Sequence, residues 1–250
     1  MKRIILLAFA LSMGLVACSA SGPREYAVKV VNEYPHDRGA YTQGLFFYNG
    51  ELYESTGQWG QSSFRKTDLE SGKVLRKIEF DSKYFGEGSV ILGGKLYMLT
   101  WTSKLAFTYD AESFKYIKTY SYPREGWGIT TDGKQLIASD GSSFLYFMDT
   151  DFRVLKKIKV TLNERPVRYL NELEWIDGRI WANVYTTDMI VIINPSTGKV
   201  DATVDCTGLL PAHLRNKDTD VLNGIAFKDG RIFLTGKNWP KLYEILLVEK

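Results

Sequence analysis

The sequence places one carboxylate and one amine in short glycine-containing segments that lie far apart along the chain. Glu87 is flanked by Gly86 and Gly88, and Lys237 follows Gly236. Carboxamide side chains occur in comparable segments, at Gln43, Asn171 and Asn223. A carboxylate and an amine in one pocket can move protons on a bound molecule, and carboxamides can position its polar atoms. These residue types indicate acid–base chemistry on a small ligand, provided that the fold brings them together.

Aromatic residues accompany these polar groups along the chain. They are Tyr41, Phe85, Trp101, Trp127 and Tyr185. Any one of these rings could simply fill a core. An aromatic wall with a few convergent polar groups is, however, the usual composition of a small-ligand site. We therefore expect these rings to line the same pocket as the polar residues.

The composition gives little support to metal or thiol chemistry. The chain has two histidines and two cysteines, which is little material for a zinc or iron–sulfur site. A calcium-dependent hydrolase would need several carboxylates, and Glu87 and Asp140 are the only obvious candidates. Cys206 and His213 lack the surrounding motif of a cysteine nucleophile. We expect no metal or other cofactor, and a buried Cys206.

The N-terminus reads as a targeting segment rather than as part of the fold. Lys2 and Arg3 precede an apolar run that ends at Cys18. The run is too short for a membrane-spanning helix, which needs roughly 20 residues. Its end resembles a bacterial lipoprotein signal, with a plain cleaved signal as the alternative. We expect residues 1–17 to be removed, Cys18 to carry lipid, and residues 18–25 to form a tether at the periplasm-facing cell envelope.

The charge balance argues against a nucleic-acid partner. The full chain has 32 basic and 29 acidic residues, a net charge of +3. Removing residues 1–17 also removes Lys2 and Arg3 and brings the chain closer to neutrality. A nearly neutral protein has no electrostatic reason to bind nucleic acid or an anionic lipid surface.

A repeat sets the predicted architecture. Turn dipeptides recur with their second residues 44, 39, 45 and 52 positions apart, and each is preceded and followed by a short apolar strand. The dipeptides are Asn49-Gly50, Gly93-Gly94, Asp132-Gly133, Asp177-Gly178 and Asp229-Gly230. Third and fourth strands follow in the first four units, whereas the fifth unit ends after its third strand. This pattern predicts an all-β, five-bladed β-propeller over residues 26–250. The alternative is a sandwich with regular hairpins, which would not require five matched units.

The missing strand of the fifth unit has a donor at the other end of the chain. Residues 26–33 are strand-like and are otherwise unpaired, so we expect them to complete the last blade and close the ring. The longest spacing contains residues 207–215, which we expect to form an inserted helical turn. In a propeller, the loops before each first strand and after each second strand meet at one mouth. This placement brings the polar and aromatic residues together.

Segments around these residues resemble the plant and bacterial type of glutaminyl-peptide cyclotransferase, a five-bladed propeller family. The resemblance covers about residues 26–247, and it depends on the order and spacing of several short stretches. These are Tyr34-Pro35-His36-Asp37, Tyr41-Thr42-Gln43-Gly44-Leu45, Phe85-Gly86-Glu87-Gly88, Leu99-Thr100-Trp101, Gly126-Trp127-Gly128, Tyr169-Leu170-Asn171-Glu172-Leu173-Glu174, Ile180-Trp181-Ala182-Asn183-Val184-Tyr185, Leu222-Asn223-Gly224-Ile225-Ala226 and Leu234-Thr235-Gly236-Lys237-Asn238-Trp239-Pro240.

The resemblance implies cyclisation of an N-terminal glutamine of a peptide or protein to pyroglutamate, with release of ammonia and without catalytic zinc. It implies an acid–base role for Glu87. By the same match, Gln43, Asn171 and Lys237 are polar site residues, and Phe85, Trp101 and Trp127 line the pocket. Tyr41 and Tyr185 stand where phenylalanine and tryptophan are expected in relatives, so their hydroxyls can change the polarity of the pocket.

The chain is expected to act as a monomer. The main alternative function is a non-catalytic envelope propeller that binds a peptide or sugar. That alternative accounts for the aromatic rings but not for an acid, an amine and carboxamides at equivalent positions of the repeat.

Overall fold

A computed structural model describes residues 22–250 of the chain. The predicted signal segment and Cys18 lie outside the described residues. Within residues 22–250 the fold is all-β, and the one helical element is a 3-10 turn at Ala212–Leu214, inside the predicted insertion. No helix in this range is long and apolar enough to cross a membrane.

Three antiparallel sheets of four strands each account for the first part of the chain, and each follows sequence order. The first contains β2 (Thr42–Tyr48), β3 (Glu51–Thr56), β4 (Ser63–Thr67) and β5 (Val74–Glu79). The second contains β6 (Gly86–Leu92), β7 (Lys95–Thr100), β8 (Leu105–Asp110) and β9 (Tyr116–Ser121). The third contains β10 (Ile129–Thr131), β11 (Leu136–Ser139), β12 (Phe144–Met148) and β13 (Val154–Lys159).

An eight-stranded sheet contains the rest, in the order β16-β17-β18-β19-β1-β22-β21-β20. One half is β16 (Leu170–Ile176), β17 (Arg179–Val184), β18 (Met189–Ile193) and β19 (Val200–Asp205). The other is β20 (Leu222–Lys228), β21 (Arg231–Gly236), β22 (Lys241–Glu249) and β1 (Arg24–Pro35). The N-terminal strand β1 pairs antiparallel with β22, as predicted. Its parallel pairing with β19, which joins the two halves, was not predicted.

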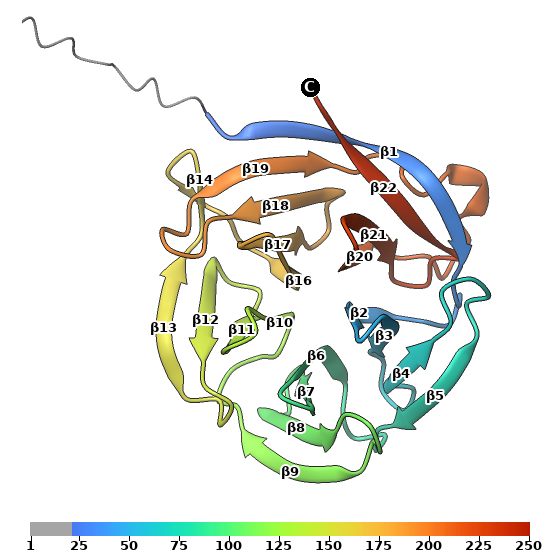
Figure 1. The fold of residues 1–250 in the computed structure, drawn as a ribbon, viewed down its shortest axis with the longest axis vertical. Helices are drawn as coiled ribbons and strands as arrows, with labels where there is room; N and C mark the ends of the chain where they lie inside the picture. The colour runs from blue at the N-terminus through green and yellow to red at the C-terminus, as the bar shows by residue number, and fades with distance from the viewer. Residues whose placement is uncertain (1–21) are drawn as a thin grey trace, which may run out of the picture.

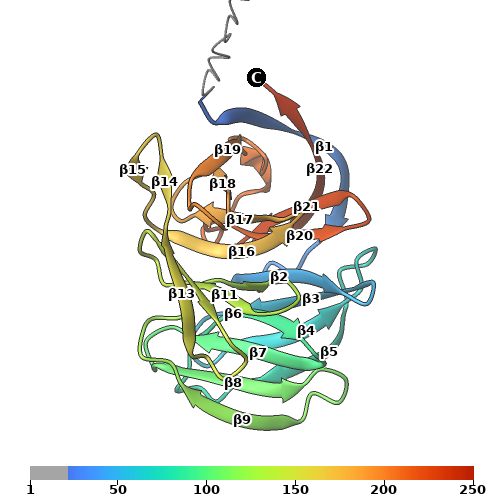
Figure 2. The same cartoon turned by 60° about the vertical axis from the view of Figure 1, so that its left-hand side comes forward.

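The sheets are arranged around a common centre, with the first strand of each unit innermost (Figure 1). Contacts follow the same order: β2 contacts β6, β6 contacts β10, β10 contacts β16, β16 contacts β20, and β20 returns to β2. The turned view shows β16 and β20 crossing the middle of the molecule above β2 (Figure 2). The starts of these inner strands therefore gather around one axis.

The turn dipeptides form the predicted hairpins, and most adopt one backbone geometry. Both residues of Asn49-Gly50, Gly93-Gly94, Asp177-Gly178 and Asp229-Gly230 have positive φ, the conformation of a type I′ turn. In the third unit only Gly133 has positive φ. There the Asp132 carboxylate accepts hydrogen bonds from the backbone of Lys134 and Gln135 instead.

Two details of the predicted strands were wrong. The apolar pattern before Asp132-Gly133 predicts a strand over residues 127–131, whereas β10 begins at Ile129. The carbonyl of Trp127 instead accepts a hydrogen bond from Gly88 of the neighbouring inner strand β6 (2.8 Å). A small hairpin of β14 (Thr161–Leu162) and β15 (Arg165–Pro166) was not predicted, because two residues per strand leave no apolar alternation to read.

A buried carboxyl group ties three inner strands together. Glu172 of β16 accepts hydrogen bonds from the backbone of Leu45 in β2 (3.2 Å) and Ile225 in β20 (2.9 Å). Burial raises the pKa of Glu172 to about 8, although these two hydrogen bonds oppose the shift. Glu172 thus fixes the start of β16, where Asn171 lies, relative to the first and last units.

A buried ionic cluster holds the segment after β1 and the segment before β22 against the first unit. Glu54 accepts hydrogen bonds from His36 (2.9 Å), Thr42 (2.6 Å) and Arg65 (2.9 Å). Burial alone would raise the pKa of Glu54, but Arg65 and His36 hold it well below its usual value. The other ring nitrogen of His36 donates to the carbonyl of Trp239 (2.7 Å). The cluster therefore fixes the loop that follows Lys237.

Replacing Glu54 with glutamine is expected to lower the free energy of unfolding by about 3–5 kcal/mol, because Arg65 and His36 lose their buried counter-ion. A lowered pKa stabilises the fold above the unfolded-state value near 4.5 and loses that effect as the pH falls. The deficit of Glu54→Gln should therefore be full at pH 7 and shrink in acid. Urea unfolding of the variant and the wild-type protein, at pH 7 and again in acid, measures the difference in their free energies of unfolding. Glu51→Gln, which removes an exposed partner of Lys66, is the control and should cost about 0.5 kcal/mol or less.

Candidate active site

One cavity of about 170 Å³ opens at the mouth formed by the starts of the inner strands and the ends of the second strands. All predicted site residues except Asn223 line it, together with one residue that was not predicted, Gln58. The lining residues are Tyr41, Gln43, Gln58, Phe85, Glu87, Trp101, Trp127, Asn171, Tyr185 and Lys237. The repeat thus brings together side chains that lie up to about two hundred positions apart.

Equivalent positions of different units supply these side chains. Three of the inner strands each contribute their second residue: Gln43 in β2, Glu87 in β6 and Asn171 in β16. Trp101 follows β7, and Lys237 follows β21. A side chain at Gly57, just after β3, would collide with the ring of Phe85, so glycine is required for that ring to reach the cavity.

The carboxyl group of Glu87 is buried at the cavity and has no hydrogen-bond partner among the residues that the structure describes. Burial raises the pKa of Glu87 well above its usual value, and the negative charge of Glu125 adds to the rise. The ammonium group of Lys237 acts in the opposite direction. A carboxyl group with a raised pKa holds a proton more strongly than an exposed one, which suits a group that accepts a proton and then returns it.

The amine of Lys237 is enclosed by two aromatic rings. Its Nζ lies 4.6 Å from the ring centre of Tyr41 and 4.9 Å from that of Tyr185. Burial lowers the pKa of Lys237, while Glu87 and Asp220 oppose the shift. Backbone hydrogen bonds between Lys237 and Val221 (2.9 Å), and between Asp220 and Lys237 (3.0 Å), hold the base of the side chain. The amine is therefore a fixed donor at the cavity.

Asp220 was not predicted, although it organises this part of the site. The hydroxyl of Tyr41 donates to the Asp220 carboxylate (2.9 Å). Burial, followed by this hydrogen bond, raises the pKa of Tyr41 far above its usual value. The extra hydroxyl of Tyr41 therefore serves to hold the ring under Lys237.

Glu125 is a second unpredicted residue of this kind. One carboxylate oxygen accepts hydrogen bonds from the indole nitrogens of both Trp101 (3.0 Å) and Trp127 (3.1 Å). These rings come from different units, and Trp127 also packs edge-on against Tyr185, with ring centres 5.6 Å apart. Glu125 therefore sets the orientation of two cavity walls without lining the cavity.

We expect Glu125→Ala to raise KM by about tenfold with a smaller change in kcat. Each hydrogen bond to a charged group contributes about 1.5–3 kcal/mol, and the freed indoles no longer hold a bound side chain in place. Steady-state kinetics with the substrate that the family resemblance implies, a peptide with an N-terminal glutamine, measures both constants. Asp132→Ala, which removes a carboxylate from a hairpin turn remote from the cavity, is the control. An unchanged KM in Glu125→Ala would show that the indoles need no such support.

The carboxamides divide into two groups. Asn171 lines the cavity, and its buried Oδ1 has no partner among residues 22–250, so it can accept a hydrogen bond from a ligand. Asn223 does not line the cavity. Its Nδ2 donates to the carbonyl of Thr42 (2.9 Å) and to Oε1 of Gln43 (3.2 Å). In the structure Asn223 therefore holds Gln43, and its predicted ligand contact stays a prediction.

Gln58 lines the cavity from the loop between β3 and β4. Its backbone has φ 90°, which is rare for a residue with a side chain. Hydrogen bonds from Ser62 (2.7 Å) and Gln61 (3.1 Å) to its carbonyl maintain that conformation. Strained backbone of this kind is concentrated at functional sites.

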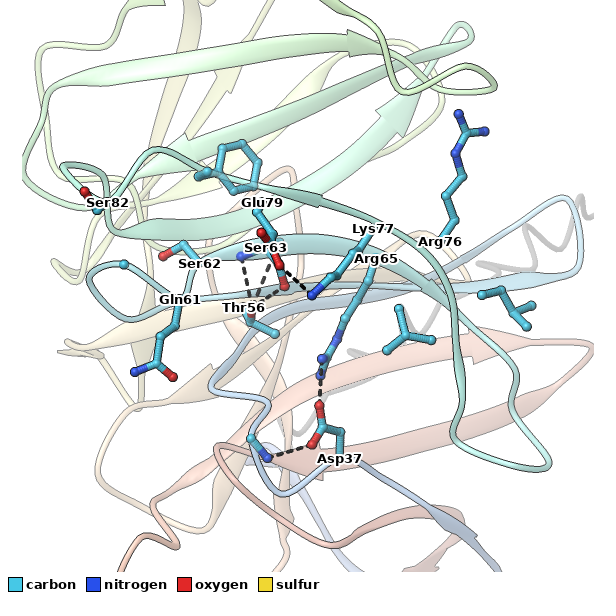
Figure 3. A pocket seen from close by; sticks show the side chains of 15 residues that line it. Asp37, Thr56, Gln61, Ser62, Ser63, Arg65, Arg76, Lys77, Glu79 and Ser82 are labelled. Carbon is cyan, nitrogen blue, oxygen red and sulfur yellow. Dashed lines mark hydrogen bonds and ion pairs between the residues drawn. The ribbon is translucent and has the colours of Figure 1, made fainter.

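A larger cavity, of about 630 Å³, lies beside β4 and β5 and contains none of the predicted site residues. Four of its charged groups form pairs: Arg65 points to Asp37, and Lys77 to Glu79 (Figure 3). The fifth, Arg76, donates to the carbonyls of Glu112 and Ser113. The free functional groups are in the smaller cavity, which we take as the candidate active site.

Within residues 22–250, no three histidine, cysteine or acidic side chains lie close enough to bind one ion. Cys206 is buried, as expected, and burial raises the pKa of its thiol.

Comparisons with known proteins agree with this arrangement. A family model described as glutamine cyclotransferase matches residues 4–247. Glutaminyl-peptide cyclotransferase of Arabidopsis thaliana is 45% identical over 227 residues, which are 88% of this chain and 71% of the plant protein. The crystal structure of Myxococcus xanthus glutaminyl cyclase has a TM-score of 0.85 at 37% identity, covering 91% of this chain and 99% of that chain.

A more distant structure shares only the fold. The WD40 β-propeller domain of Doa1 has a TM-score of 0.50 at 12% identity, covering 81% of this chain and 62% of that chain. The family match spans nearly the whole chain and includes every segment that lines the cavity. The chain belongs to the glutamine cyclotransferase family.

Proposed function

We propose that this protein is a glutaminyl-peptide cyclotransferase, which converts the N-terminal glutamine of peptides or proteins to pyroglutamate and releases ammonia. The observation that carries the proposal is the free, buried carboxyl group of Glu87 beside Lys237, inside a small aromatic-walled cavity. Family membership and the 45% identical plant enzyme support the same activity.

The proposed scaffold is one domain, residues 26–250, folded as a five-bladed propeller. The support is the five repeated units, the cycle of contacts between inner strands, and the pairing of β1 with β22. Pairing of the two chain ends resists opening of the ring. The ring matters to function because each unit contributes a different group to one mouth.

The reaction is intramolecular, so the protein need not supply a nucleophile. The α-amine of the substrate attacks the carbon of its own side-chain amide. The aromatic walls hold the side chain folded back on the amine, and positioning of this kind can contribute roughly 7–11 kcal/mol. The unpartnered Oδ1 of Asn171 is suited to accept a hydrogen bond from the substrate amine.

Glu87 moves the proton that the reaction must transfer. As its carboxylate, it accepts a proton from the attacking nitrogen when the new carbon–nitrogen bond forms. It then returns the proton to the departing amide nitrogen, which leaves as ammonia when the old carbon–nitrogen bond breaks. The tetrahedral intermediate between these steps carries negative charge on oxygen. We assign its stabilisation to the buried ammonium of Lys237.

The test is a mass measurement on a synthetic Gln-headed peptide. Loss of one ammonia, faster than the spontaneous reaction, is the expected result with the wild-type protein and in the presence of a chelator, because the proposed chemistry is metal-independent. Binding of the peptide without loss of ammonia would instead support a non-catalytic binding protein.

We also propose that the protein is anchored by lipid on Cys18 and faces the periplasm. The support is the sequence of the N-terminal segment alone: a basic start, a short apolar run and the cysteine. Cys18→Ala should move the protein from the membrane fraction to the soluble fraction of fractionated cells. If its distribution does not change, the anchor assignment is wrong.

A further inference from the structure

Exposed aromatic rings stand beside the mouth of the cavity. Trp59 has 48% of its surface exposed, and Trp101 has 36%. Both contact the buried ring of Phe85, a wall of the cavity, with ring centres 5.7 Å and 5.5 Å apart. The aromatic surface of the cavity therefore continues outward, and we call Trp59 and Trp101 the aromatic ledge.

The ring of Trp101 is held by a hydrogen bond although it is exposed, and the backbone just before Trp59 has a defined conformation. The indole nitrogen of Trp101 donates to Glu125. Trp59 follows Gln58, whose unusual backbone is maintained by Ser62 and Gln61. Large apolar side chains fixed in water beside a ligand cavity are typical of a surface that is covered when a ligand binds.

The size of the cavity determines what lies on the ledge. Pockets for drug-sized ligands measure roughly 300–1,000 Å³, whereas this cavity measures about 170 Å³. It can take little more than the one residue that reacts. The rest of a peptide substrate must leave through the mouth, and the residue after glutamine is the first to emerge.

We propose that the aromatic ledge is the subsite for the second residue of the substrate, and that it favours an apolar or aromatic side chain there. This inference rests on the proposed cyclotransferase activity. Contact between aromatic rings contributes about 0.5–1.5 kcal/mol beyond the effect of buried area. The Glu125 carboxylate lies directly beside Trp101, so an acidic second residue is disfavoured by repulsion.

The experiment compares kcat/KM for peptides that differ only at the second position: Gln-Phe, Gln-Gly and Gln-Asp, each followed by the same neutral residues. With the wild-type protein we expect Gln-Phe to exceed Gln-Gly by about tenfold, and Gln-Asp to be the poorest. In Trp59→Ala the ratio of Gln-Phe to Gln-Gly should fall to about two or below, and Trp59→Phe should restore most of it. Tyr116→Ala, which removes an exposed ring on the outermost strand β9, is the matched control and should leave the ratio unchanged.

The outcomes separate this inference from the activity itself. If wild-type protein converts none of the peptides, the proposed function fails and the subsite with it. If it converts them at equal rates, or if Trp59→Ala keeps the wild-type ratio, the activity stands and the ledge is not the second subsite. Thermal unfolding of each variant verifies that a changed ratio comes from a folded protein.

Discussion

Replacing Glu87 with glutamine is expected to lower kcat by about 10²- to 10⁴-fold, with KM changed by no more than a few-fold. The glutamine side chain has nearly the same shape but cannot accept a proton from the attacking nitrogen. It introduces no charge, the Lys237 ammonium keeps Asp220 as an acidic neighbour, and the carboxyl group that is replaced has no hydrogen-bond partner within residues 22–250. The fold and the walls of the cavity should therefore persist.

The pH dependence provides a second signature of Glu87. The carboxylate form is the base, so kcat should rise as the pH passes upward through the pKa of Glu87. Burial places that pKa well above 4.5. The acid limb of the kcat profile, over which kcat rises with pH, should therefore lie at a correspondingly high pH. Glu87→Gln should remove this limb from whatever activity remains. Release of ammonia followed between pH 4 and pH 9 measures both effects, with Glu51→Gln as an exposed control.

A Glu87→Gln protein with near-normal kcat would exclude the catalytic role of this carboxyl group. A raised KM with normal kcat would also contradict it, because the residue would then act only in binding. The two constants must therefore be measured separately.

Repetition made the scaffold predictable from sequence. Turn dipeptides such as Asn49-Gly50 are local signals, because positive φ at both positions is a property of the residues themselves. The unpaired strand at the start of the chain and the incomplete last unit pointed to the pairing of β1 with β22. The small hairpin at residues 161–166 carries no such signal.

Site residues that lie at equivalent positions of the repeat could be predicted in the same way. Gln58 had a usable signal, because it directly follows Gly57. Gly57 comes just after the second strand of its unit, as Trp101 and Lys237 do in theirs. Glu125 and Asp220 had none. Each acts through hydrogen bonds to side chains of other elements, and these partners are known only once the elements are placed. Asn223 lies at an equivalent position of the repeat, but its carboxamide bonds to the carbonyl of Thr42 and does not line the cavity. The position in the repeat does not determine the direction of the side chain.

Replacing Lys237 with methionine is expected to lower kcat/KM by about 10²- to 10³-fold, the usual effect of removing one donor to a tetrahedral intermediate. Methionine preserves the length and apolar body of the side chain between Tyr41 and Tyr185. The loss should appear mainly in kcat, because the negative charge on oxygen exists only after attack. Lys241→Met, which removes an amine whose nearest acidic partner is Glu33 on β1, is the control.

The same variant tests the coupling between the two buried groups. The ammonium of Lys237 opposes the rise in the pKa of Glu87, so its removal should raise that pKa further. The acid limb of the kcat profile in Lys237→Met should therefore move to higher pH than in the wild-type protein. A lower rate with an unmoved limb would mean that Lys237 acts on the substrate alone. A normal rate would mean that the carboxamides stabilise the negatively charged oxygen of the intermediate. The electrostatic role proposed for Lys237 would then be wrong.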